Sequence, residues 1–449
     1  MNILDSLINP PTTEHIALLN IIQVIAFLMF LPFIGMLFGG TILSVYFNSK
    51  YRRTKDPLFL KFSKDIIDRL TFSRNLGWGM GILPVFTITV IYAQFLYGAK
   101  VISVGLFLLS TLLYITSFVF IYNYKNTFHI ENVFKAFKAF TNNDSSSLPS
   151  EVREFEKNIL KSNVRYGNFG MWLLIIASFL FVGSYTIASD PGSWESNNGL
   201  MSVFLNGQIW LNFFYFVSAS FAISGGAILY LFFIWQGGIK DMDDKYKSLS
   251  QKTGIYIALI ASLVQPLFLI LNFINEPQGG LTGSNFFLTG ISIVSILLVC
   301  NFLYAALRNS EIKYASPAFF LIFLTFIFSV IQQQMAFGNS IKPHLYTVTQ
   351  KAEELKKEIE GKTISTTGVD PEAIYNTKCI ACHKFDVKLV GPPYQETVPK
   401  YAGDVKKLSE FIYNPQKINP AFPPMPNQGL KQKEADAMAQ WLIKKVSGK

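Results

Sequence analysis

The sequence is poor in charged residues and in cysteine. Only 15% of its 449 residues are Asp, Glu, Lys or Arg, against roughly 25% in ordinary globular domains, and half of the residues are hydrophobic. Three cysteines in a chain of this length cannot build the dense framework of a disulfide-stabilised secreted domain. The composition therefore argues against an all-soluble protein and against a disulfide scaffold.

The net charge of +10 does not by itself indicate nucleic-acid binding. Lysine and arginine lie mostly in short loops between apolar runs or in the C-terminal quarter of the chain. No basic helix is interleaved with aromatic residues, as a nucleic-acid-binding surface would require. We therefore expect no nucleic acid among the partners, and we expect a membrane part followed by a water-facing C-terminal part.

Eight apolar runs are long enough to cross a membrane. A helix needs about 20 residues to span a hydrocarbon layer of about 30 Å, and tryptophan or tyrosine flanks several of the runs, as in interfacial aromatic belts. The sequence therefore predicts an all-α bundle of eight transmembrane helices within residues 1–340. The runs lie near residues 16–47, 75–98, 101–123, 168–188, 209–236, 254–274, 284–307 and 317–337.

The basic residues predict the orientation of this bundle. Alternate loops are rich in Lys and Arg, whereas the loops 189–208 and 275–283 contain neither. Because cytoplasmic loops are enriched in basic residues, both chain ends are expected outside, with an uncleaved first span. We expect a multi-pass protein of a bacterial inner membrane whose C-terminal domain is periplasmic. The predicted cytoplasmic loops are 49–74, 125–165, 240–252 and 308–316.

The predicted spans contain almost no ionisable residue. Such residues usually mark haem ligands and proton paths in membrane proteins, so we expect no haem in the membrane part. Hydrogen bonding between helices is the ordinary role of buried amides, and a quinone pocket is the alternative. The amides in question are Asn20, Gln23, Gln94, Gln265 and Asn272. Glu14 and His15 form the best polar pair for a site, although a solvated helix start explains them as well.

Residues 379–383 read C-I-A-C-H. Two thiols three residues apart can form thioether bonds to the two vinyl groups of one haem, and the next histidine then lies beneath the iron. A zinc site needs four ligands, and no second cysteine pair or nearby histidine supplies them. A thioredoxin-like redox pair would need a βαβ context, which is missing. The motif therefore predicts one covalently bound haem c, held by Cys379, Cys382 and His383.

A methionine is the expected second axial ligand of the iron. No histidine follows His383, and Met425 and Met438 are the two methionines downstream. Met425 lies in the proline-rich stretch AFPPMPNQG, which can aim a thioether at a haem face. Met438 lies on the predicted final helix, in a position typical of core packing. We predict Met425 as the ligand, with Met438 or a displaced ligand as alternatives.

Residues 369–449 contain, in order, a helix, CxxCH, GPPY, a middle helix, PPMP and a final helix. This layout resembles a class I (monohaem) cytochrome c, which implies a small all-α domain, His/Met ligation and single-electron transfer. The resemblance implies no oxygen binding. The GPPY turn at 391–394 is expected to orient the imidazole through a carbonyl. Three lysines near the haem segment provide either a docking face or solubilising charge: Lys378, Lys384 and Lys388.

Residues 341–368 predict a helical linker between the two parts. The stretch QKAEELKKEIEGK is charged and helical in pattern, with an i,i+4 pair at Glu353 and Lys357. Gly361 is expected to end this short helix. The linker would hold the C-terminal domain away from the membrane.

The membrane part resembles subunit I of the cytochrome bd quinol oxidases over roughly residues 10–275. The stretches AFLMFLPFIGMLFGG, RNLGWGMGILPVFTITVIYAQFLYG and NFFYFVSASFAISGGAILYLF are similar to the first, second and fifth helices of that family. The family's haem ligands are missing, however. The first-helix histidine position falls at Ala26 or Phe27, the fifth-helix segment has no histidine, and the third span has no acidic residue. The resemblance implies a bd-type scaffold without its haems.

Together these features predict a membrane-bound c-type cytochrome that relays single electrons between a membrane respiratory complex and a periplasmic carrier. One haem accepts one electron, so quinol chemistry would need a partner subunit, such as a haem-bearing bd-like chain. Two alternatives remain. One is a subunit of a divergent bd-like quinol oxidase or quinol dehydrogenase with other ligands, such as His15, and the other is a membrane anchor for a cytochrome c. No catalytic residue is predicted, and enzymatic activity of the chain alone stays open.

Overall fold

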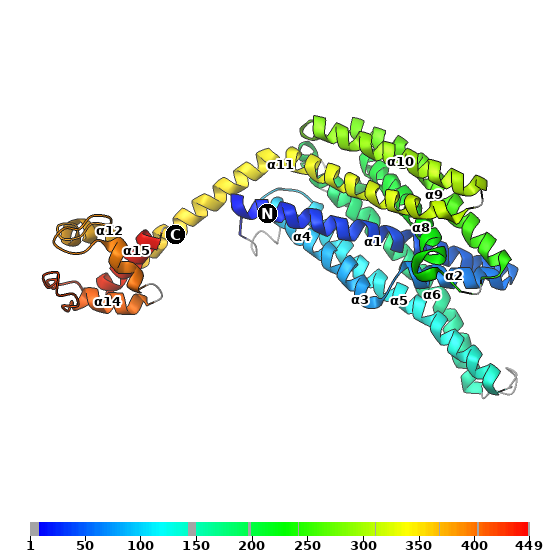
Figure 1. The fold of residues 1–449 in the computed structure, drawn as a ribbon, viewed down its shortest axis with the longest axis horizontal. Coiled ribbons are helices and arrows are strands. Elements are labelled where there is room, and N and C mark those ends of the chain that lie inside the picture. Colours follow the sequence, from blue (N-terminus) through cyan, green and yellow to red (C-terminus); the bar gives the residue numbers. More distant parts are fainter. Residues whose placement is uncertain are drawn as a thin grey trace. The chain divides into compact units, whose positions relative to one another are not determined.

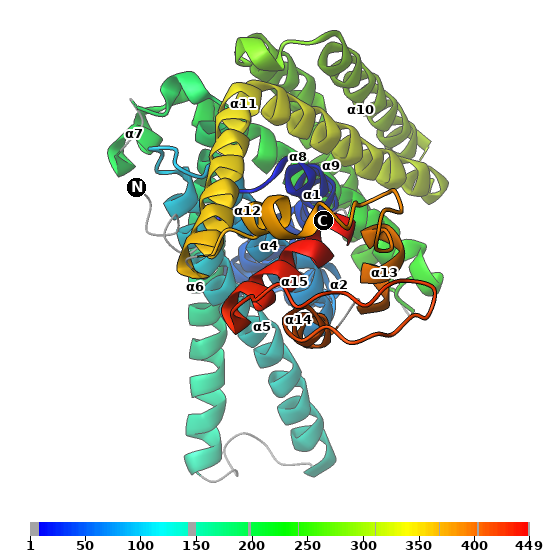
Figure 2. The same cartoon turned by 90° about the vertical axis from the view of Figure 1, so that its left-hand side faces the viewer.

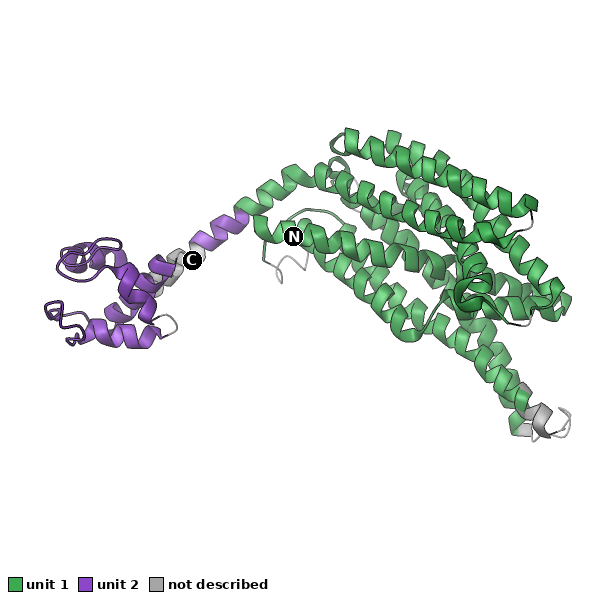
Figure 3. Cartoon of the chain, viewed as in Figure 1, with its two compact units in different colours: residues 1–350 green, residues 351–449 purple. Residues whose placement is uncertain are grey.

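The computed structural model describes residues 9–141, 150–195, 199–240, 242–309, 311–367, 369–401 and 404–447. Every regular element in these ranges is a helix, which confirms the predicted all-α class. Contacts divide the chain into two compact units, residues 1–350 and 351–449 (Figure 3).

Eight helices in the described ranges are long and apolar enough to cross a membrane, in agreement with the eight predicted spans. They are α1 (Thr13–Thr54), α3 to α4 (Arg74–Gly77, the π-helical η2 at Trp78–Ile82, and Leu83–Phe95), α5 (Ser103–Thr141), α6 (Ser150–Ala188), α8 (Gly207–Phe233), α9 (Asp244–Ile274), α10 (Gly283–Asn309) and α11 (Ala315–Thr367) (Figure 1). The shorter elements of this unit are α2 (Pro57–Leu70), α7 (Leu200–Leu205) and the 3₁₀ turns η3 (Pro191–Ser193), η4 (Trp235–Gly237), η5 (Gln278–Gly280) and η6 (Ile312–Tyr314).

The predicted loop 125–165 is largely helical. α5 continues to Thr141 and α6 begins at Ser150, while residues 142–149 lie outside the described residues. Each helix has 39 residues and is therefore about 58 Å long, roughly twice the thickness of a hydrocarbon layer. The two helices lie side by side and extend away from the rest of the first unit (Figure 2). An apolar pattern marks only the membrane portion of such a helix, so its polar continuation was not predicted.

The expected helix end at Gly361 is wrong. α11 continues from the last span to Thr367 without an intervening end. A glycine inside a helix costs only about 1 kcal/mol relative to alanine, and charged residues before it are good helix formers. The predicted linker is therefore a continuation of the last spanning helix and not a separate short helix.

Glycines let α8 approach its neighbours closely. A Cβ atom on Gly39 of α1 would lie 2.3 Å from Oγ of Ser224 in α8, and one on Gly225 of α8 would lie 2.6 Å from the backbone nitrogen of Ala258 in α9. Small residues at helix crossings give membrane helices the van der Waals contact that holds them together. Accordingly, 72% of the apolar stretch of α8 is buried, against 28% for α9, which makes α8 a central helix.

Aromatic rings fill the space between α1, α4, α5 and α6. The ring centroid of Phe30 lies 5.0 Å from that of Phe181 and 5.4 Å from that of Tyr114. Tyr92 and Phe107 are 4.5 Å apart. All five side chains are almost fully buried. Tilted and edge-on ring pairs of this kind stabilise a core beyond the area that they bury, which accounts for part of the high phenylalanine content.

After α11, the described part of the second unit contains six short helical elements, and the three predicted helices are found among them in the expected order. They are α12 (Pro371–Ile374), the π-helical η7 (Tyr375–Cys379), α13 (Tyr394–Thr397), η8 (Val398–Tyr401), α14 (Val405–Tyr413) and α15 (Gln432–Ser447). Their buried side chains, among them Leu408, Met438 and Leu442, form one core. Met438 is only 1% exposed, which confirms its predicted place in core packing.

Candidate functional site

The C-I-A-C-H segment begins where η7 ends. Cys379 is the last residue of η7, and its carbonyl oxygen accepts hydrogen bonds from the backbone N–H groups of Cys382 at 3.1 Å and His383 at 2.9 Å. This tight turn brings both sulfur atoms and the imidazole to the wall of one cavity. The local backbone therefore places the three predicted haem-binding side chains together.

The cavity is large and mostly apolar. It has a volume of about 1520 Å³, counted with its mouth open to solvent, whereas small-molecule sites usually have about 300–1,000 Å³. Cys379, Cys382 and His383 line one part of it, and Met425 lines another. The remaining apolar lining includes Val398, Tyr401, Leu408, Phe411, Ile412, Phe422 and Leu442.

The donor atoms fit a haem. Two thiols, one imidazole and one thioether around a single apolar cavity are the donor set of a covalently attached haem with His/Met ligation. Met425 is half-buried in the loop between α14 and α15. Met438 also lines the cavity, but from the buried face of α15. Both methionines named from the sequence thus lie at the cavity, and Met425 is the one on an extended loop.

The imidazole of His383 is held in one orientation. Its Nδ1 atom lies 2.9 Å from the carbonyl oxygen of Pro392. Because a carbonyl only accepts hydrogen bonds, Nδ1 carries the hydrogen and Nε2 is left with a free lone pair for a metal. This contact confirms the expectation that the GPPY turn orients the imidazole through a carbonyl.

Gly391 leaves room for the same ring. A Cβ atom at this position would lie 2.2 Å from Cε1 and 2.6 Å from Nδ1 of His383. Any residue other than glycine would therefore displace the imidazole or the turn. The backbone N–H of Gly391 also donates to the carbonyl of Cys382 at 2.9 Å, which ties the turn to the CxxCH segment.

Aromatic rings also pack around His383. The ring of Tyr394 stacks on the imidazole at 5.1 Å between centroids and an angle of 19°. Phe385 and Tyr375 pack against Tyr394 at 5.5 and 6.2 Å. The hydroxyl of Tyr375 donates to the backbone carbonyl of His383 at 3.4 Å. These contacts restrict movement of the imidazole further.

Cys379 does not have the lowered thiol pKa of a redox-active cysteine. Burial raises the pKa of the Cys379 thiol above its ordinary value. Catalytic CxxC cysteines instead have a lowered thiol pKa, because the thiolate is the nucleophile. This observation agrees with attachment of a group rather than with disulfide exchange.

The polar residues singled out in the membrane part are not brought together into one site. Glu14 and His15 are exposed in the first turn of α1, where the backbone N–H of His15 donates to Oγ1 of Thr12 at 3.4 Å. That geometry is an ordinary helix cap. Gln23 is buried in α1, where its side chain faces the hydroxyl of Tyr92 in α4. Among the described residues, the pair at 14–15 lines none of the cavities found here.

Two adjoining cavities lie in the first unit, at two of the amides for which a quinone pocket was the alternative prediction. The first, about 800 Å³, is mostly apolar and includes Gln265; the second, about 1000 Å³, is polar and includes Asn272 and Glu276. Four residues line both cavities: Tyr185, Asn212, Tyr215 and Gln333. Burial raises the pKa of the Glu276 carboxyl to about 7. The sequence indicated these cavities only weakly, because helix packing decides whether amides on different helices come together.

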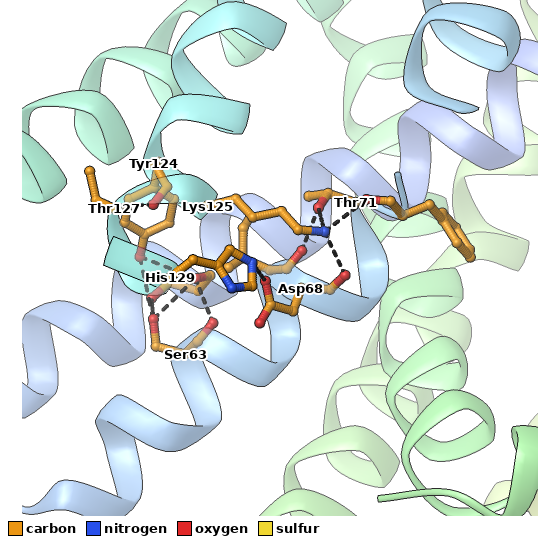
Figure 4. A network of polar contacts seen from close by, with 10 residues as sticks. Ser63, Asp68, Thr71, Tyr124, Lys125, Thr127 and His129 are labelled. Atoms are coloured by element: carbon orange, nitrogen blue, oxygen red, sulfur yellow. Dashed lines mark hydrogen bonds and ion pairs between the residues drawn. The ribbon is translucent and has the colours of Figure 1, made fainter. Parts of the chain in front are cut away.

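A polar cluster around Lys125 and His129 connects α5 to the C-terminal end of α2. The Nζ atom of Lys125 in α5 donates to the carbonyls of Asp68 and Phe72 at 2.8 and 2.7 Å, at the end of α2 (Figure 4). The imidazole of His129 lies 3.2 Å from the Asp68 carboxylate. Lysine near a helix C-terminus satisfies free carbonyls and favours the helix dipole. The polar groups of Lys125, His129 and Asp68 therefore help to hold α5 against the end of α2.

Known proteins resemble the C-terminal part of the chain. The family model for cytochrome c matches residues 370–444. Cytochrome c-551 of Pseudomonas aeruginosa is 35% identical over 78 residues, which are 16% of this chain and 75% of that protein. Cytochrome c-551 of Azotobacter vinelandii is 37% identical over 76 residues, 16% of this chain and 93% of that protein. Cytochrome c-552 of Hydrogenobacter thermophilus is 34% identical over 68 residues, 14% and 69% respectively.

Proposed function

We propose that this chain, which belongs through residues 370–444 to the cytochrome c family, is a membrane-bound electron carrier with one covalently bound haem c. In this proposal Cys379 and Cys382 would attach the haem, and His383 and Met425 would bind its iron. The observation that carries the proposal is the single cavity lined by all four side chains. When bound, the haem supplies an iron that alternates between the ferric and ferrous states.

The protein's own residues would control this centre in three ways. The carbonyl of Pro392 holds the proton on Nδ1 of His383 and so would leave Nε2 free to bind the iron. Apolar side chains such as Leu408 and Ile412 keep water from the cavity wall. A thioether ligand from Met425 favours the ferrous state and raises the reduction potential. These features suit the acceptance and release of single electrons.

We further propose that residues 1–340 are a membrane domain, 341–368 a helical linker and 369–449 the cytochrome domain. The charge distribution of the loops supports a bacterial inner membrane, both chain ends outside, and a periplasmic cytochrome. The similarity of the membrane helices to cytochrome bd subunit I, without that family's haem ligands, supports a role beside other respiratory subunits. Electrons would pass between such a membrane complex and a periplasmic carrier.

Quinone binding is a second candidate function, and the two adjoining cavities favour it. A polar cavity beside an apolar one suits a hydrogen-bonding ring with a hydrocarbon tail. Gln333 and Tyr185 lie where the two cavities meet. A quinone analogue should raise the unfolding temperature of the chain in detergent, and Asn212→Leu should abolish this increase. No shift at saturating analogue would reject this candidate without affecting the cytochrome.

Potentiometry tests the main proposal. Spectra of the purified full chain, recorded against applied potential, should show one c-type centre that follows a one-electron Nernst curve. The variant Cys379→Ala/Cys382→Ala should lose the centre, since no covalent attachment remains. Two or more haem centres, or a centre that persists in the double variant, would contradict the proposal.

A further inference from the structure

The loop that carries Met425 is held by only a few short-range hydrogen bonds of its own, such as those from the backbone N–H of Ala421 to Asn419 at 3.0 Å and of Gly429 to Asn427 at 2.8 Å. Between α14 and α15 it contains five prolines, at 415, 420, 423, 424 and 426. Proline has no backbone N–H, so these positions cannot donate the hydrogen bonds that would stabilise the loop. Contacts with other parts of the unit therefore add to the few bonds that keep Met425 at the cavity.

Two lysines on either side of the CxxCH segment reach this loop. The Nζ atom of Lys378 donates a hydrogen bond to the backbone carbonyl of Gln428 at 3.1 Å. The Nζ atom of Lys388 lies over the ring of Phe422, 4.7 Å from its centroid. Phe422 and Gln428 are each three residues from Met425, on opposite sides. The two contacts therefore hold the loop at both flanks of the methionine.

Both contacts join the CxxCH segment to the Met425 loop. Lys378 precedes Cys379 directly, and Lys388 lies between His383 and the GPPY turn. Each lysine thus links the segment that carries the proximal histidine to the loop that carries the methionine. Both interactions depend on a positive charge, since a cation binds an aromatic face and a charged donor strengthens a hydrogen bond.

We propose that Lys378 and Lys388 are positioning residues that clamp the Met425 loop over the cavity and so stabilise the methionine–iron bond. The inference rests on the proposed haem ligation and deepens it. It also gives two of the three lysines near the haem segment a role inside the domain, distinct from docking or solubility. Lys384, the third, is exposed, and among the described residues no hydrogen bond or ring contact joins its side chain to the loop.

Displacement of the methionine by added imidazole tests the clamp. The full-length ferric haem protein is titrated with imidazole, and loss of the methionine–iron absorption band in the red region is followed. Each of Lys378→Gln and Lys388→Gln should bind imidazole about two- to fivefold more tightly than the wild type, as loss of one hydrogen bond at Lys378 or of one exposed cation–π contact at Lys388 implies. Lys388→Arg should restore the wild-type affinity, because arginine also binds an aromatic face.

Lys384→Gln is the matched control, because it removes the same charge beside the same histidine. It should leave the imidazole affinity unchanged. Equal affinities for the wild type and both clamp variants would overturn the inference while leaving the proposed function intact. An equal change in Lys384→Gln would also overturn it, since the effect would then come from net charge. A wild-type haem protein without the methionine band would instead refute Met425 ligation and the clamp together.

Discussion

Gly391→Ala is expected to damage the haem site through a single methyl group. The new Cβ would lie 2.2 Å from Cε1 of His383, so the ring or the turn must move by more than 1 Å to reach ordinary contact distance. Overpacking of this kind costs about 1–3 kcal/mol, and loss of the Nδ1 hydrogen bond to Pro392 adds about 1 kcal/mol. We expect the C-terminal unit to lose about 2–4 kcal/mol of unfolding free energy.

Denaturant titration of the full chain in detergent, followed by the haem absorption of the C-terminal unit, measures this loss. Pro392→Ala is the control, because it preserves the carbonyl that His383 contacts and should cost less than about 1 kcal/mol. The alanine at 391 should also weaken the methionine–iron band, since a displaced His383 would hold the haem less well. A Gly391→Ala variant with wild-type stability and an unchanged spectrum would refute the argument that this glycine makes room for the imidazole.

Three further predictions concern other side chains. Met425→Ala should abolish the methionine–iron band and lower the reduction potential, whereas Met438→Ala should keep the band and cost about 2–5 kcal/mol of stability as a core truncation; the opposite pattern would exchange their roles. Tyr394→Leu should destabilise the C-terminal unit by about 2 kcal/mol more than Tyr394→Phe, because ring pairs worth about 0.5–1.5 kcal/mol each are lost, and equal unfolding midpoints would contradict this. The pKa of Glu276 is raised to about 7 by burial, so its contribution to stability is greatest below its unfolded pKa and falls as pH rises toward 7. Thermal unfolding between pH 5 and pH 8 should show this decline, and Glu276→Gln should remove it.

The residues proposed to bind the haem could be named from the sequence because their chemistry is local. Cys379, Cys382 and His383 form one short motif, and Met425 was the remaining soft donor outside a helix. The eight apolar helices could also be predicted from the sequence, since a hydrocarbon layer requires a certain length and composition of each helix that crosses it. The structure added the contacts that hold His383 in place, above all the close approach of Gly391 to the imidazole.

Other features depend on packing and left little trace in the sequence. The polar halves of α5 and α6 carry no apolar signal, so their helices were predicted too short. Glycine is common at helix ends, which is why Gly361 was expected to end the helix. The low helix propensity of one residue is outweighed by the helical residues on both sides of it. The contacts of Lys378 and Lys388 join residues 34 to 50 positions apart, and the membrane cavities need five or more helices to form. No local pattern reports such contacts.

The count of covalently bound haem tests the central claim most directly. Acid–acetone treatment of the purified full chain releases non-covalent haem and leaves thioether-linked haem on the protein. We expect one haem per chain to remain, and mass spectrometry should find it on the peptide that contains Cys379 and Cys382. Haem that is wholly extracted, or an unmodified C-I-A-C-H peptide from a chain matured with a functional haem-attachment system, would contradict the account.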